Sequence, residues 1–278
     1  MSEQSLGPDK TRSLLIAKGQ GWQADEVVCG AGPGDRPFEE QHAWTSVAAV
    51  LSGVFSYRSD RGRALMTPGS LLLGEAGTCF RCGHEHATGD RCLAFHFAPD
   101  LVEETLSGLA GRGASGFTAP RLPPLERLLP LLSRAKRLAG SRDAREAEAL
   151  ALDVARSAFG VDGERTSRPP STREEAKAAE AVRIIDAAFA DPLTVAGLAA
   201  AVGLGRQRLA VAFRRTVGVA PYNYVLRRRL SAAAERLRAG QESVLSIALD
   251  VGFGDLSEFT RRFRRHYGVS PGAWRRMR

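Results

Sequence analysis

The stretch Leu198-Ala-Ala-Ala-Val-Gly-Leu-Gly205 recurs 49 residues later as Ile247-Ala-Leu-Asp-Val-Gly-Phe-Gly254. Six further positions match at a spacing of 50 residues, so one extra residue lies in the second turn. They are Leu209, Phe213, Gly218, Val219, Pro221 and Tyr224, which correspond to Phe259, Phe263, Gly268, Val269, Pro271 and Trp274. Agreement at so many positions indicates that the C-terminal part contains two copies of one structural unit.

Each copy is predicted to form two short helices joined by a tight turn. The first helix should end near Val202, because Gly203 can adopt the left-handed conformation that such a turn requires. The second helix should be buried through Leu209 and Phe213, which lie four residues apart on one face. This is helix-turn-helix geometry, in which the second helix is free to enter a major groove of DNA.

The stretch between the two units is predicted to be one rigid helix that sets their spacing. Residues 221–237 contain no proline or glycine after Pro221, and Gly240 follows shortly after them. In the second unit, Ile247, Val251 and Phe253 should pack beneath the second helix. The two units are therefore expected to hold a fixed distance from each other.

The positive charge of the chain lies in the same part of the sequence. The 278 residues include 39 lysines and arginines and 31 acidic residues, which gives a net charge of +8. Residues 171–278 hold 19 of the basic and 10 of the acidic residues, whereas residues 1–170 are close to neutral. A basic domain beside a neutral one favours a polyanionic partner, although a basic surface can also serve solubility alone.

Four segments of the C-terminal part resemble the AraC/XylS family of transcription regulators. They are Arg229-Leu230-Ser-Ala-Ala233, Ile247-Ala-Leu-Asp-Val-Gly-Phe253, Phe259-Thr-Arg-Arg-Phe263 and Tyr267-Gly-Val-Ser-Pro271, and the resemblance spans residues 181–276. It implies a seven-helix module whose two recognition helices enter successive major grooves of double-stranded promoter DNA. It also implies a sequence-specific transcription regulator, usually an activator that works through RNA polymerase.

The resemblance places the DNA-reading residues on the second helix of each unit. They are Arg206, Gln207, Ala210, Val211 and Arg214 in the first unit and Leu256, Ser257, Thr260, Arg261 and Arg264 in the second. Gln207 can pair with an adenine edge, and Arg261 can pair with guanine O6 and N7. Ala210 and Val211 can only touch thymine methyl groups, which departs from the polar residues often found there. Phosphate contacts, or a solvated helix face instead, are expected for Arg214, Arg215, Arg262, Arg264 and Arg265.

The N-terminal half is predicted to be a small β-barrel or sandwich. Residues 12–98 contain short apolar segments between glycine turns, for example residues 47–54 and 71–73. Residues 92–97 alternate as in a half-buried strand. The arrangement around Gly53, Pro68-Gly69 and Gly77 is similar to the cupin-like barrel that AraC-type regulators commonly carry for an effector, and His42 falls where such domains often have a histidine.

Residues 122–159 change to helical character. Two apolar stripes, with Gly140-Ser141 between them, predict a helical hairpin that either covers the barrel or forms a homodimer interface. The stripes are Leu125, Leu128, Leu129 and Leu132, then Ala147, Leu150, Ala151, Val154 and Ala158. The predicted fold class is therefore α+β. It comprises a cupin-like barrel with a helical hairpin in residues 1–160, a linker in 161–173, and an all-α double helix-turn-helix DNA-binding domain in 174–278.

Five cysteines and histidines, the residue types that bind transition metals, lie within one stretch of 14 residues in the N-terminal half. They are Cys79, Cys82, His84, His86 and Cys92. On a strand, Cys82, His84 and His86 would share one face, and a hairpin could bring Cys92 beside them. A site for zinc or another transition metal such as copper is chemically reasonable, and buried cysteines with surface histidines are the alternative. The effector is accordingly predicted to be a small molecule, a metal or a redox signal.

Two other classes of protein rank below a regulator. A cupin oxygenase would use His84, His86 and Asp90, but only His96 could serve as its later histidine ligand. A DNA-repair methyl acceptor would need four cysteines around one metal, and Cys29 lies 50 residues before Cys79. We therefore predict that the chain is not an enzyme. The sequence shows no apolar run of about 20 residues and no secretory signal, which predicts a cytoplasmic protein with no membrane contact. Its cysteines should then be reduced, metal-bound or redox-active rather than paired in structural disulfides.

Overall fold

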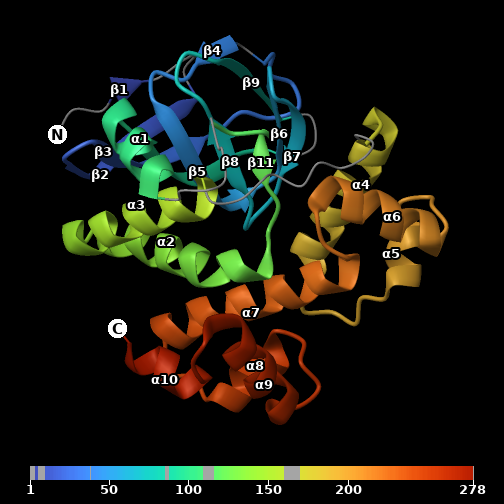
Figure 1. Cartoon of the computed structure of the whole chain (residues 1–278). Helices are drawn as coiled ribbons and strands as arrows, with labels where there is room; N and C mark the ends of the chain where they lie inside the picture. Colours follow the sequence, from blue (N-terminus) through green and yellow to red (C-terminus); the bar gives the residue numbers. More distant parts are fainter. Residues whose placement is uncertain are drawn as a thin grey trace. The chain divides into compact units, whose positions relative to one another are not determined.

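The computed structural model describes residues 4–5, 10–37, 39–84, 88–108, 116–159 and 170–277 (Figure 1). The chain divides after Pro169 into two compact units, and each is considered by itself. The first unit is rich in strands and the second is helical, which confirms the predicted α+β class. Residues 161–169 of the predicted linker lie outside the described residues. None of the described helices is both long enough and apolar enough to span a bilayer.

The described residues of the N-terminal unit form two antiparallel sheets. The larger has the strand order β1-β2-β3-β10-β5-β8-β11, and the smaller has the order β4-β9-β6-β7. The strands of the larger sheet are β1 (Gln4–Ser5), β2 (Thr11–Gly19), β3 (Trp22–Cys29), β5 (Thr45–Gly53), β8 (Leu71–Gly74), β10 (Asp90–Phe97) and β11 (Arg121–Leu122). Those of the smaller are β4 (Glu39–Gln41), β6 (Phe55–Ser59), β7 (Gly62–Met66) and β9 (Cys79–Gly83). The expected strands in residues 12–98 are thus confirmed.

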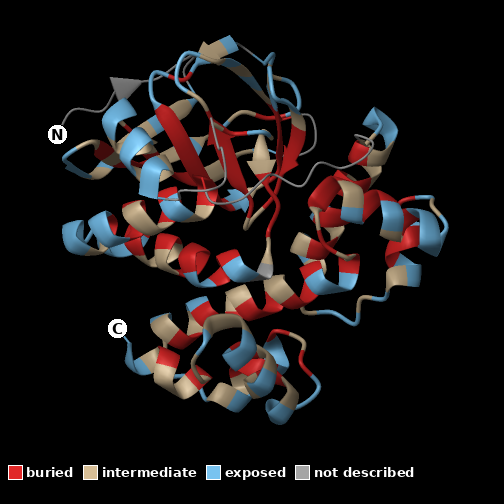
Figure 2. Cartoon of the chain, viewed as in Figure 1, coloured by how far each residue is buried: buried red, intermediate tan, exposed pale blue. Residues whose placement is uncertain are grey.

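Helices cover the outer face of the larger sheet. They are α1 (Pro99–Gly108), the 3-10 turn η1 (Glu126–Leu128), α2 (Leu129–Ser141) and α3 (Ala144–Phe159). Both predicted apolar stripes pack in one core with residues of the larger sheet, and all of their residues except the partly buried Leu125 are buried, as the burial colours of α2 and α3 illustrate (Figure 2). The stripes therefore cover the sheet, and these faces are not available as a dimer interface.

The helical hairpin differs from its prediction at both ends of the first helix. Leu122 still pairs with β8, and Pro123-Pro124 follows, so regular helix begins only after them. At the other end Gly140 stays inside α2. The turn falls instead at Arg142, which adopts φ 56° and donates its backbone N–H to the carbonyl of Leu138. A left-handed residue with a side chain is uncommon, which is why the sequence favoured the glycine.

β10 lies between β3 and β5 and is buried on both faces. Leu93, Phe95 and Phe97 belong to the core beneath α2 and α3, whereas Cys92 and Ala94 pack in the space between the two sheets. The prediction of a half-buried strand is therefore wrong. The second face is covered by the smaller sheet, and alternation cannot distinguish two different apolar environments.

The C-terminal unit consists, over residues 170–277, of seven helices, as the resemblance implied. They are α4 (Thr172–Ala188), α5 (Val195–Ala201), α6 (Arg206–Val217), α7 (Pro221–Ala239), α8 (Val244–Asp250), α9 (Leu256–Tyr267) and α10 (Pro271–Arg276). α4 begins two residues before the predicted domain start and carries a capping box between Ser171 and Glu174. α7 is one uninterrupted helix that ends at Gly240, as predicted.

The two predicted tight turns are present. Gly203 follows α5 with φ +68°, and Gly252 follows α8 with φ +93°. Buried Arg229 of α7 ties the second turn to the rest of the unit. Its guanidinium donates hydrogen bonds to three backbone carbonyls, at 2.6 Å to Phe189, 2.7 Å to Asp191 and 2.6 Å to Gly252. This arginine therefore fixes the second helix-turn-helix against the end of α4.

Candidate functional site

α6 and α9, the second helix of each repeated unit, turn the ten predicted DNA-reading residues outward. Arg206, Gln207, Val211, Arg214, Leu256, Ser257, Arg261 and Arg264 are exposed, and Ala210 and Thr260 are half-buried. The opposite faces are held in the core by Leu209 with Phe213 and by Phe259 with Phe263, all completely buried. Both faces are thus accessible, and their contact with DNA stays a prediction.

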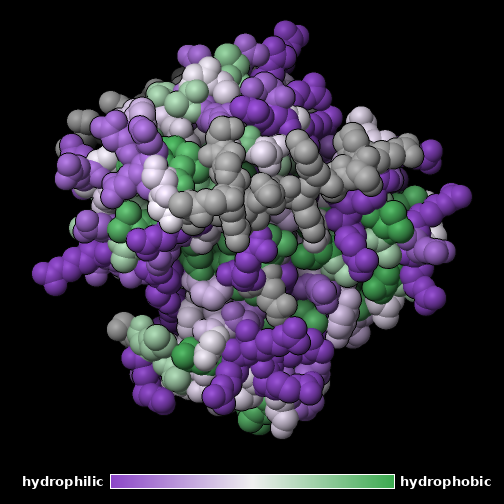
Figure 3. Space-filling model, in the orientation of Figure 1, coloured by the Kyte–Doolittle hydropathy of each residue, from purple (hydrophilic) through white to green (hydrophobic). Residues whose placement is uncertain are grey.

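The arginines of these helices fall into two groups. Across the described residues, no hydrogen bond or ion pair joins the side chain of Arg261 or Arg264 to another group. Arg262 instead donates to Glu258 at 2.8 Å, and Arg215 pairs with Glu174 at 2.8 Å. A shallow surface on α9 is lined by Arg261, Arg264 and their neighbours. Figure 3 shows hydrophilic residues gathered over the region of α8 and α9. Arg261 and Arg264 are accordingly the freer cations for an external anion.

A second candidate site is a pocket of about 730 Å³ between the two sheets of the N-terminal unit. Alternate residues of two paired strands line one wall, because successive side chains of a strand point to opposite faces. They are Gln23, Asp25, Val27 and Cys29 of β3 and Asp90, Cys92, Ala94 and His96 of β10. Cys29 lies opposite Asp90 in the register and Gln23 lies opposite His96. The wall is therefore polar at both ends and mainly apolar between them.

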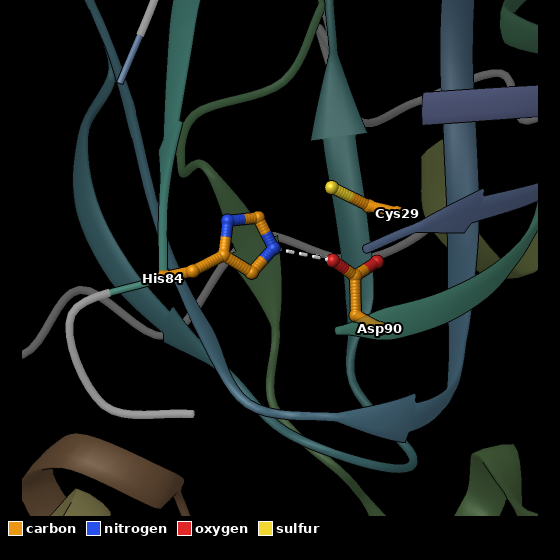
Figure 4. Close-up of side chains that lie close together, drawn as sticks. All are labelled: Cys29, His84 and Asp90. Carbon is orange, nitrogen blue, oxygen red and sulfur yellow. Dashed lines mark hydrogen bonds and ion pairs between the residues drawn. The ribbon is translucent and has the colours of Figure 1, made fainter. Parts of the chain in front are cut away.

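At one end of this wall Cys29, His84 and Asp90 point toward one another (Figure 4). Nε2 of His84 lies 2.6 Å from Oδ2 of Asp90. One potential ligand atom from each of the three residues lies within 4.8 Å of the other two. His84 and Asp90 are almost fully buried, with side chains 5% and 7% exposed. We call these three residues the Cys-His-Asp cluster.

Contacts within the Cys-His-Asp cluster shift the pKa values of His84 and Cys29. Burial alone would lower the pKa of His84, but hydrogen bonds with Asp90 and Cys29 outweigh it and raise the pKa to about 9. Burial raises the pKa of Cys29, and hydrogen bonds with His84, the Ala31 amide and Thr11 overcome it, so the net shift is downward. The arrangement favours a charged imidazolium between two groups that can carry negative charge.

The other polar end of the pocket contains a second histidine. His96 lies with Nδ1 2.9 Å from the Ser46 hydroxyl and Nε2 3.4 Å from Oδ2 of Asp25. Gln23 donates to the same Asp25 oxygen at 2.7 Å. Burial lowers the pKa of His96. This end offers hydrogen-bond donors and acceptors, among them the Asp25 carboxylate, that could orient a small polar ligand.

His42, which the resemblance picked out, lies on the opposite side of the pocket. Its Nε2 lies 2.9 Å from the Tyr57 hydroxyl, and its ring stacks on Phe80 with centroids 4.1 Å apart. Burial, with a smaller contribution from His96, lowers the pKa of His42 to about 4. A neutral histidine is therefore part of the pocket wall.

The five residues predicted as metal ligands are not brought to one point. Cys82, His84 and Cys92 line the pocket, whereas Cys79 is exposed on the other face of β9. His86 lies outside the described residues. Burial raises the pKa of both Cys82 and Cys92, which makes them poor thiolate ligands. The prediction is wrong for Cys79, since strand alternation turns its side chain away from Cys82.

Cys29 lies at this end of the pocket but was not among the predicted metal ligands. Its distance of 50 residues from Cys79 argued against it, but β3 and β10 are neighbours, and their register puts Cys29 beside Asp90. The sequence indicates one of the two strands, because alternate residues of one segment would share a face of it. These residues are Gln23, Asp25, Val27 and Cys29. The pairing of that segment with β10 could not be read from the sequence.

Both halves of the chain match known domain families. Residues 198–277 match the family model described as a helix-turn-helix domain, and residues 28–155 match the one described as an AraC-like ligand binding domain. The first match contains α6 and α9, and the second contains most of the residues that line the pocket. The two matches lie in tandem and account for both candidate sites.

Known relatives match part of the chain. The HTH-type transcriptional regulator MtrA of Neisseria gonorrhoeae is 36% identical over 86 residues, 31% of this chain and 29% of its own. The HTH-type transcriptional regulator ArgR of Pseudomonas aeruginosa is 30% identical over 157 residues, 55% of this chain and 46% of its own. The chain thus spans less than half the length of these relatives.

A solved structure is also similar over part of the chain. It is an AraC-type transcriptional regulator of Chromobacterium violaceum, with 29% identity, 38% of this chain and 96% of that one covered, and a TM-score of 0.36. The two family matches show that this chain belongs to the AraC family, with an AraC-like ligand binding domain before a helix-turn-helix domain, and the relatives named above are transcription regulators.

Proposed function

We propose that the chain binds promoter DNA sequence-specifically through α6 and α9 and activates transcription in response to a small ligand in the N-terminal pocket. The observation that carries the proposal is the duplicated helix-turn-helix. Each copy buries one face of its second helix and exposes the other, and the exposed face of both second helices carries arginines. A basic helix face beyond a tight turn fits a major groove.

The two helices are proposed to read DNA differently. On α9, Ser257, Thr260 and Arg261 can form hydrogen bonds with base edges, and Arg264 can reach a phosphate. On α6, Val211 is 51% exposed beside Ala210, which suits contact with thymine methyl groups. The sequence preference should therefore be stronger in the half-site that α9 reads.

The N-terminal pocket supports ligand control. A volume of about 730 Å³ with two polar ends and an apolar middle is typical of a pocket for a small molecule. Control requires that the ligand bind one functional state of the protein more tightly than another. Contact with RNA polymerase belongs to the same proposal and rests on the family resemblance.

Selection of DNA by the intact chain tests the proposal. Random-sequence duplexes are incubated with the full chain, retained duplexes are sequenced, and affinity for the enriched site is measured against a shuffled site at one fixed salt concentration. We expect an enriched site with two half-sites and at least about 1,000-fold preference over shuffled DNA. Equal affinity for enriched and shuffled duplexes would contradict sequence-specific binding.

A further inference from the structure

Three strands bring a thiol, an imidazole and a carboxylate to one end of the pocket. Cys29 is the last residue of β3, Asp90 is the first of β10 and its register partner, and His84 directly follows β9. Their potential ligand atoms all lie within 4.8 Å of one another. Ligand atoms around tetrahedral zinc lie roughly 3.5 Å apart, so small shifts of these side chains, in which His84 and Asp90 separate slightly, would place all three on one ion.

We propose that Cys29, His84 and Asp90 bind a zinc ion whose fourth coordination position faces the pocket. Zinc accepts sulfur, nitrogen and oxygen ligands together. Magnesium and calcium prefer oxygen alone, so this mixed set disfavours both. The three residues lie on separate segments of a sandwich of two sheets, so the framework holds them in place.

Further contacts orient each of the three ligands. Sγ of Cys29 accepts hydrogen bonds from the Ala31 amide at 3.5 Å and the Thr11 hydroxyl at 3.6 Å. The thiol of Cys92 donates to Oδ1 of Asp90 at 3.5 Å, which leaves Oδ2 toward the cluster. Such outer contacts are typical of metal sites, where they fix the direction of the ligand atoms.

The His84 ring is also held in place. It stacks on Phe55 with centroids 5.8 Å apart and an interplanar angle of 23°. Its Nε2 faces Asp90, so this is the nitrogen that meets the ion. The ring needs no new rotamer to bind zinc, but Nε2 must give up its proton and move farther from the carboxylate as the ion binds.

The fourth coordination position of the ion would be open to the pocket. Cys29, His84 and Asp90 all line the cavity, so an ion between them would be reached from its interior. A zinc ion with three protein ligands keeps one position for water or for a donor atom of another molecule. A ligand entering the cavity could therefore bind the ion directly.

Cobalt titration of the metal-free full-length chain tests the proposal. Cobalt(II) can take the place of zinc, and a thiolate–cobalt bond gives an ultraviolet charge-transfer band. We expect one cobalt per chain with this band, and zinc should displace the cobalt. Cys29→Ser should abolish the band, and Asp90→Asn, which keeps the size of the side chain, should weaken binding at least about 100-fold.

Cys79→Ser is the matched control, because Cys79 is exposed on the other face of β9. It should leave both the band and the affinity unchanged. Circular dichroism confirms that each variant is folded, and if Cys29→Ser fails this check, Asp90→Asn decides. Absence of uptake by the wild type, an undiminished affinity in Asp90→Asn, or loss of the band in Cys79→Ser would overturn the proposal. The assay contains no DNA, so its failure would leave the proposed function standing.

Discussion

Arg261 and Arg264 are both exposed on α9, yet they should contribute to DNA binding in different ways. Arg261→Ala should weaken binding to the selected site by about 1–3 kcal/mol and relax the preference at one base pair. Arg264→Ala should weaken binding to selected and shuffled DNA alike, because a phosphate contact carries no sequence information. Affinity measured on both duplexes at several salt concentrations separates the two effects, and only Arg264→Ala should reduce the salt slope by about one.

Arg183 provides a control for these two variants. It is exposed on α4, outside both second helices, and carries the same charge. Arg183→Ala should leave the affinity within about threefold of the wild type. If it weakened binding as much as Arg261→Ala, net charge rather than the face of α9 would explain the result.

His42 should make the N-terminal unit less stable in acid. Its pKa is about 4 in the folded chain and near 6.5 when unfolded. As the pH falls below 6.5 the unfolded chain takes up the proton first, so the free energy of unfolding decreases until about pH 4. The loss should be on the order of 3 kcal/mol at most. Urea unfolding of the N-terminal unit at pH 7 and pH 4.5 measures it.

His42→Gln should reduce this acid sensitivity, because glutamine does not titrate and can still form a hydrogen bond with Tyr57. His266→Gln on α9, in the other unit, should leave it as in the wild type. An equal loss of stability in His42→Gln and the wild type would show that another group takes up the proton.

At the scale of elements, the two tight turns look alike in sequence but have different surroundings. A Cβ at Gly252 would lie 2.4 Å from the Ala190 carbonyl oxygen and 2.9 Å from Cζ of Arg229. A Cβ at Gly203 would meet no atom within 4 Å. Gly203→Ala should therefore cost about 1–2 kcal/mol, from its left-handed backbone alone. Gly252→Ala should cost more than about 3 kcal/mol, because a backbone carbonyl and Arg229 must also move.

Urea unfolding of the C-terminal unit in the two variants checks this difference. Each substitution adds the same methyl group at a positive φ, so each serves as the control for the other. Equal costs would mean that the contacts of Arg229 do not constrain the second turn.

The helical elements could be predicted from sequence because their determinants are local. Gly203 and Gly252 each lie no more than 11 residues before the buried pair of the following helix, α6 or α9, and the repeat shows this pattern twice. The pocket depends instead on pairing between distant strands. Cys29 and Asp90 are 61 positions apart, and only the register of β3 with β10 brings them together. For the same reason the sequence predicts a half-buried β10. The smaller sheet covers the second face of β10, and the residues of β10 alone do not reveal that contact.

At the scale of the whole molecule, we expect α6 and α9 to bind two DNA half-sites as one rigid unit. α7 joins the two units as an uninterrupted helix of 19 residues. Arg229, near its middle, is hydrogen-bonded to the end of α4 and to the second turn. The distance between the reading helices is therefore fixed by the fold, and the half-sites should lie about one helical turn of DNA, roughly 34 Å, apart.

Changing the spacing of the half-sites tests this claim most directly. Five base pairs are inserted between the half-sites of the selected duplex, which turns one half-site to the opposite face of the DNA. The affinity of the full chain is then compared with that for the original duplex and for one in which the half-site read by α9 is scrambled. We predict that insertion lowers the affinity as far as scrambling does. Affinity for the inserted duplex equal to that for the original would contradict the claim of a rigid two-helix reader.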